Sequence, residues 1–95
     1  MGAVGTSSYS LSSDRKVEIT KGIEDHTKEQ NDNAEKYYVE RINKEKDVVD
    51  NYQSYLSVGK IKSKEDEWWQ YHENAYKSLT AQYNFFLKER QRLGK

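Results

Sequence analysis

The last third of the chain, residues 64–93, carries an apolar and largely aromatic stripe at the spacing of an α-helix. Alternate steps of three and four residues from Trp69 reach eight positions, six of them large apolar or aromatic: Trp69, His72, Tyr76, Leu79, Tyr83, Phe86, Arg90 and Leu93. This spacing places the side chains on one helix face, in the pattern that packs against another helix. The stripe therefore predicts a long helix that needs a partner surface.

A second amphipathic segment, residues 32–57, precedes this helix. Asp32 and Glu35 stand three residues apart, as at the start of a capped helix. Apolar residues then recur seven residues apart, as in a coiled-coil seam, at Ile42, Val49 and Leu56. Glu45 interrupts the parallel series that joins Tyr38 to Tyr52. The pattern predicts a second long helix with one polar residue in its seam.

Residues 58–63 form the expected turn between these two helices. Gly59 suits the left-handed position just after a helix end, and Ser63 is expected to cap the next helix. A short turn between two long amphipathic helices predicts an all-α fold, an antiparallel helical hairpin with coiled-coil-like packing.

The N-terminal third carries weaker signals. Residues 1–13 are rich in Gly, Ser and Thr and predict a flexible or extended arm. Residues 14–31 fit either a helix capped by Ser12 or Ser13, or a short strand over residues 16–20. A strand would have no second strand to pair with, so we favour a third helix. Residues 14–95 then form a single helical domain.

Composition limits how much of this domain can be core. Hydrophobic and charged residues each make up 34% of the chain, and the mean hydropathy is −1.19. Globular domains are usually about half apolar, so the core must be thin or completed by other chains. Two Trp, eight Tyr and two Phe argue against disorder in the second half, because disordered segments contain few aromatic residues. We therefore expect a homo-oligomer or docking onto other subunits of an assembly.

The charge balance and the hydropathy pattern narrow the partners. The chain has 16 basic and 16 acidic residues, and its formal net charge is zero. Proteins that bind mainly through phosphate contacts are usually basic, so nucleic acid is a weaker candidate partner than protein. No run of about 18 apolar residues occurs, which argues against a membrane span. We expect a soluble protein, in the cytoplasm or within a virion-type assembly.

The aromatic residues of the last helix fall into two sets when each residue is turned by about 100°. The larger set is expected to form the hairpin core or an interface: Trp68, Trp69, His72, Tyr76, Leu79, Tyr83 and Phe86. Tyr71 and Phe85 lie on the far side, where we expect an outward contact with a partner. The alternative for this pair is ordinary exposure, because single aromatic residues on a surface are common.

No sequence motif in the chain indicates catalysis, metal binding or cofactor binding. Cysteine is absent, the two histidines His26 and His72 are far apart, and no HExxH spacing occurs, so we expect no metal site. Phosphate-binding glycine loops and the GxSxG motif are also missing. We therefore expect no catalytic residues, no cofactor, no small-molecule substrate and no enzymatic activity.

The C-terminal end is locally basic. Lys88, Arg90 and Arg92 follow Phe85 and Phe86, and basic residues beside aromatic ones can bind single-stranded nucleic acid. The competing interpretation is compensation of the helix dipole, which favours positive charge at a helix C-terminus. We prefer the second interpretation and keep the three residues as candidate nucleic-acid contacts.

Together these patterns favour a non-enzymatic structural or adaptor subunit that packs through its aromatic helices into a larger protein assembly. Its size, arm and composition suit a virion component. Two alternatives remain from the sequence alone. One is a nucleic-acid-associated protein that uses the basic C-terminal end, and the other is a small helical chaperone or regulator that masks a helix of its partner.

Overall fold

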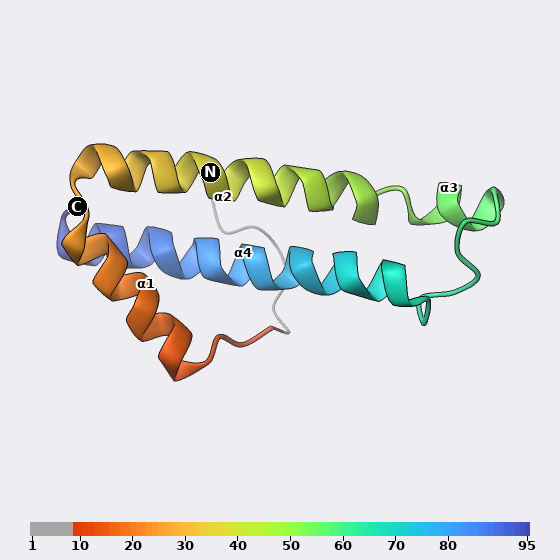
Figure 1. The fold of residues 1–95 in the computed structure, drawn as a ribbon, viewed down its shortest axis with the longest axis horizontal. Coiled ribbons are helices and arrows are strands. Elements are labelled where there is room, and N and C mark those ends of the chain that lie inside the picture. The colour runs from red at the N-terminus through yellow and green to blue at the C-terminus, as the bar shows by residue number, and fades with distance from the viewer. Residues whose placement is uncertain (1–8) are drawn as a thin grey trace.

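The computed structural model describes residues 9–95, and this part of the chain is all-α, without a β-strand (Figure 1). Its helices are α1 (Ser13–Asp25), α2 (Lys28–Val49), α3 (Tyr52–Ser57) and α4 (Glu67–Leu93). Helices α2 and α4 lie side by side and antiparallel, which confirms the predicted hairpin. Residues 1–8 of the predicted arm lie outside the described residues.

Helix α1 confirms the choice of helix over strand for the N-terminal segment. The Ser12 hydroxyl accepts a hydrogen bond from the Arg15 backbone N–H at 3.1 Å and so caps the helix. Ile19 and Ile23, four residues apart on one face, are both buried. This face lies against α4, so α4 has α2 on one side and α1 on another (Figure 1).

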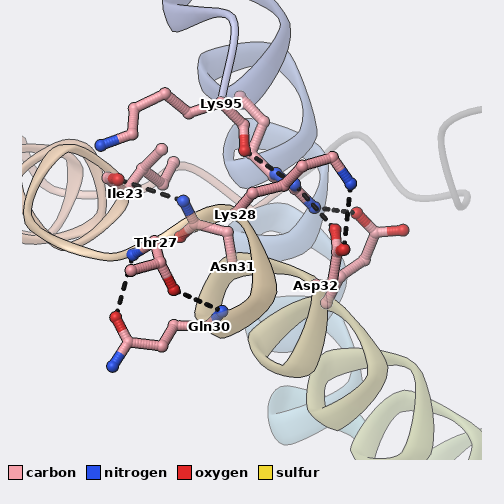
Figure 2. Close-up of polar contacts among 9 residues, drawn as sticks. Ile23, Thr27, Lys28, Gln30, Asn31, Asp32 and Lys95 are labelled. Atoms are coloured by element: carbon pink, nitrogen blue, oxygen red, sulfur yellow. Dashed lines mark hydrogen bonds and ion pairs between the residues drawn. The ribbon is translucent and has the colours of Figure 1, made fainter.

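Helix α2 begins at Lys28, four residues before the predicted start at Asp32. Thr27 and Gln30 form a reciprocal capping box in place of Asp32 and Glu35 (Figure 2). The Gln30 backbone N–H donates to the Thr27 hydroxyl at 3.2 Å, and the Thr27 N–H donates to the Gln30 side chain at 2.9 Å. The predicted 14–31 segment is therefore divided, and only residues 26 and 27 separate α1 from α2.

The far end of the hairpin also differs from the prediction. The expected 32–57 helix is interrupted at residues 50 and 51, after which α3 adds six residues. The last helix starts at Glu67 rather than at residue 64, because Asp66 is the cap and accepts from the Trp69 N–H at 3.0 Å. Ser63 instead accepts from the Glu65 N–H at 3.1 Å. Gly59 has the predicted positive φ, 77°.

Two small clusters of buried side chains form most of the core, and Trp69 and Ile61 are buried in addition. Ile42, Leu79 and Tyr83 pack between α2 and α4, whereas Ile19, Ile23 and Phe86 pack between α1 and α4. Tyr38 contacts both clusters. Burial raises the pKa of Tyr38 and of Tyr83 above its ordinary value. The aromatic stripe of α4 is therefore shared between two neighbouring helices.

Leu79→Ala should destabilise the hairpin, because Leu79 is 4% exposed at the centre of the α2–α4 cluster. Truncation of a buried leucine costs about 2–5 kcal/mol. Val17→Ala is the matched control, since Val17 is 65% exposed and its loss should change the free energy of unfolding by about 0.5 kcal/mol or less. Urea unfolding followed by circular dichroism measures both. Equal effects of the two variants would contradict this core.

Candidate interaction surface

Most of the residues predicted to form the core or interface of the last helix face the other helices. Trp69, Leu79, Tyr83 and Phe86 are buried, and Tyr76 and His72 are half-buried. Trp68 differs, because 37% of its surface remains exposed. The α4 stripe is therefore covered along its length from Trp69 to Phe86, and Trp68 at its edge is the partly exposed exception.

His72 pairs with the polar residue that interrupts the seam of α2. Its Nδ1 lies 2.5 Å from a carboxylate oxygen of Glu45, and the two side chains are only 22% and 19% exposed. Each polar group thus has its partner across the hairpin, which avoids the cost of an unpaired polar group at a packed surface. The pairing of Glu45 with His72 could have been predicted from the sequence, because each residue interrupts an apolar stripe and the two stripes face each other in the hairpin.

Aromatic rings gather around the start of α4. Trp68 packs edge-on against Tyr55 and against His72, with ring centroids 5.4 and 4.7 Å apart. The Lys60 ammonium lies 4.6 Å from the centroid of the Trp68 ring. Trp68 is therefore held in place by its neighbours while part of it faces solvent.

Tyr71 and Phe85, both predicted to face outward, have different surroundings. Tyr71 is 69% exposed, and its ring lies edge-on to the His72 ring with the two centroids 5.1 Å apart. Phe85 is half-buried and packs against the cluster that α1 forms with α4. The Lys16 ammonium of α1 lies 5.9 Å from the Phe85 ring. Helix α1 covers more of α4 than its few apolar residues predicted, and the outward contact expected of Phe85 is made within the chain.

The side of α4 that α1 covers continues toward the start of the helix, where it is only partly covered. Residues 18 apart lie about five turns apart and point the same way. Phe86, Glu89 and Leu93 all contact α1 or its cluster, and Trp68, Tyr71 and Ala75 stand 18 residues before them. We call the set Trp68, Tyr71, Ala75 and Ser78 the open face of α4. Figure 1 shows α2 along most of α4, whereas α1 lies beside the C-terminal part of α4 only.

Arg90, predicted as a nucleic-acid contact, is used inside the fold. Its guanidinium donates to Glu35 at 3.0 Å, to Asp32 at 2.9 Å and to the Lys95 carbonyl at 2.7 Å, and its side chain is 13% exposed (Figure 2). These bonds join the end of α4 to the first turns of α2. They also lower the pKa of Asp32, through hydrogen bonds from Arg90 and then from Lys28.

The other two basic residues of this end lie on the surface. Arg92 forms two hydrogen bonds with the Glu89 carboxylate, at 2.7 and 2.9 Å, and Lys88 is exposed. Glu89 also accepts a bond from the Thr20 hydroxyl of α1 at 2.8 Å. The Arg92 and Thr20 hydrogen bonds lower the pKa of Glu89 to about 2. Glu89 is therefore a polar tie between α1 and α4, which the sequence did not reveal.

The part of the chain that the structure describes contains no group of three or more His, Cys, Asp or Glu residues placed to hold a metal ion. Over the same residues, 9–95, no helix is long and apolar enough to cross a bilayer. The open face of α4 combines the exposed ring of Tyr71 with the partly exposed ring of Trp68, over which the Lys60 ammonium lies.

Arg90→Ala should lower the free energy of unfolding by about 1–3 kcal/mol, because it leaves charged hydrogen-bond partners without their donor. Arg92→Ala is the matched control, and its effect should be smaller because the Arg92 side chain is 59% exposed. Thermal unfolding of the two variants checks the order. Equal stability of both variants and the parent chain would show that the Arg90 bonds do not hold the helix ends together.

Glu89→Gln should destabilise the protein at neutral pH and have less effect in acid. The folded pKa of about 2 lies below the ordinary 4.5, so the carboxylate stabilises the fold above about pH 4.5 and loses this contribution as pH falls toward 2. The difference in urea midpoint between parent and variant should shrink over that interval. Glu18→Gln, at a 65% exposed side chain, is the control and should change the urea midpoint little. A Glu89→Gln difference that stays constant with pH would contradict the tie.

Comparison of the chain with models of protein families, with curated proteins and with solved structures finds no match. The role of the open face is therefore argued from its own residues and their contacts.

Proposed function

We propose that this chain is a non-enzymatic structural or adaptor subunit that packs against protein through the open face of α4, as part of a larger assembly. The observation that carries the proposal is the exposure of Trp68 and Tyr71 on the continuation of the face that α1 covers. Tryptophan and tyrosine are enriched at the centres of protein interfaces, where they contribute most of the binding energy.

The arrangement of these rings supports binding to a protein. Trp68 is wedged between Tyr55 and His72, and Tyr71 leans on the same imidazole. Side chains already held in place lose little conformational entropy when a partner docks. The neighbouring Glu45–His72 pair is satisfied within the chain, so a partner that covers it need not supply a polar group.

The polar composition of the whole chain fits the same role. With 34% hydrophobic residues, the chain concentrates its apolar groups on α4 and leaves part of that helix for another molecule. A particle built from repeated subunits, such as a virion, is an assembly in which a small helical chain of this kind would serve.

The proposal is tested by following incorporation of the chain into assemblies of its native source. The double variant Trp68→Ser/Tyr71→Ser should lose most of its incorporation, about tenfold or more, because hot-spot aromatic residues carry several kcal/mol of binding energy. Tyr37→Ser is the matched control, since Tyr37 is also exposed, at 60%, but lies on α2. Density-gradient sedimentation of native extracts measures the bound and free fractions. A parent chain that sediments only as a free 11.2 kDa protein would refute the proposal.

A further inference from the structure

A groove runs between α1 and the C-terminal part of α4, which lie beside each other in Figure 1. The two helices advance in the same general direction, because Arg15 donates to Gln82 and Thr20, further along α1, donates to Glu89. Two hollows of about 290 and 550 Å³ lie along this groove, and Lys16 lines both of them. The hollows are therefore neighbours on one continuous surface.

The groove carries two pairs of basic side chains, with one member of each pair on each helix. Lys16 of α1 and Lys88 of α4 line the smaller hollow, and Lys21 of α1 and Arg92 of α4 line the larger. The second pair follows the first by about 7.5 Å of helix rise on α1 and by about 6 Å on α4. Phosphates of a single strand that is extended beyond the about 3.4 Å rise of a duplex have a comparable spacing.

These basic side chains are accessible to an incoming anion. Among the described residues, Lys16, Lys21 and Lys88 are exposed and form no ion pair with a carboxylate. Arg92 is paired with Glu89, but its side chain is 59% exposed, so a phosphate can reach the guanidinium from the solvent side. The smaller hollow has no acidic residue among the described residues that line it.

Acidic residues limit the length of the groove that can hold a negatively charged ligand. The Glu89 carboxylate is already engaged by Arg92 at 2.7 Å and by Thr20 at 2.8 Å. Glu24 and Asp25 line the larger hollow just after Lys21, at the end of α1, where they repel a phosphate. The favourable segment therefore holds about two phosphates, one for each basic pair.

Aromatic rings beside the first basic pair favour nucleic acid over an acidic peptide. Tyr9 and Phe85 both line the smaller hollow. Tyr9 is 42% exposed, and the Lys16 ammonium lies 5.9 Å from the centroid of the Phe85 ring. Surfaces that bind single strands combine rings on which bases stack with cations that contact the phosphates. A peptide carboxylate would use the lysines alone.

We propose that the groove between α1 and α4 binds a short stretch of single-stranded nucleic acid, with one phosphate at each basic pair and a base against Tyr9. Lys88 and Arg92, which the sequence suggested as nucleic-acid contacts, belong to this site. Arg90 does not, because its guanidinium is bonded within the fold. The site is distinct from the open face of α4 and does not depend on protein binding there.

Binding is measured by fluorescence anisotropy of a labelled oligo(dT) of about 15 nucleotides, added to the full chain. The parent should bind at about 50 mM salt and lose about sevenfold in affinity at about 200 mM, as for two neutralised phosphates. Lys16→Ala/Lys88→Ala should lower the affinity about fivefold or more and halve the salt dependence. Lys36→Ala/Lys44→Ala is the matched control, since both lysines are exposed on α2 and the net charge changes equally. Circular dichroism should show the parent helicity in both variants.

A parent chain that does not bind at about 50 mM salt overturns the site. Equal losses in the two double variants also overturn it, because the attraction then comes from the whole chain. Polyglutamate of the same length should compete poorly with the labelled strand. If it displaces the strand as well as unlabelled oligo(dT) does, the groove recognises negative charge alone and nucleic acid is not its ligand.

The open-face variant Trp68→Ser/Tyr71→Ser separates this site from the proposed function. It should bind the oligonucleotide as the parent chain does, even where it fails to enter assemblies. Loss of oligonucleotide binding in this variant would place the strand on the open face and overturn the groove.

Discussion

The ring of Tyr38 packs against the rings of Tyr83 and Phe86 of α4, with centroids 5.9 and 5.2 Å away. Through these contacts the core between α2 and α4 continues into the core between α1 and α4. Each cluster alone has three buried residues, too few for independent stability in a domain of this size. Aromatic side chains bury large areas, so one tyrosine joins two thin cores into one structure.

The long helices and their antiparallel pairing are predictable from sequence. The large side chains from Trp69 to Leu93 recur every three or four residues, and among regular secondary structures only the α-helix places such residues on one face. Their ends are less predictable. Asp32 and Thr27 both begin a plausible cap, and the choice depends on which residue takes extended backbone dihedrals between two packed helices. In the same way, Ser63 and Asp66 are both plausible caps for the last helix, and Asp66 is the one that caps α4 in the structure.

The candidate interface is predictable in part, for a physical reason. The exposure of Tyr71 follows from its angle on the helix, whereas the cover of Phe85 depends on where α1 lies in space. The role of Arg90 likewise depends on where another helix lies. A basic residue at a helix C-terminus satisfies the dipole in any environment, but its bonds to Asp32 and Glu35 exist only because α2 returns to that point.

The two-residue connection between α1 and α2 has a consequence for motion. Helix α1 touches the rest of the molecule through two buried isoleucines and a few polar bonds, whereas α2 and α4 share a much longer seam. Free energies of local opening follow the amount of buried contact, so they should rise from α1 to the middle of the hairpin. Local opening of α1 should therefore expose Phe86 and more of Phe85 to solvent, four to five turns along α4 from Trp68 and Tyr71, while the α2–α4 hairpin stays closed.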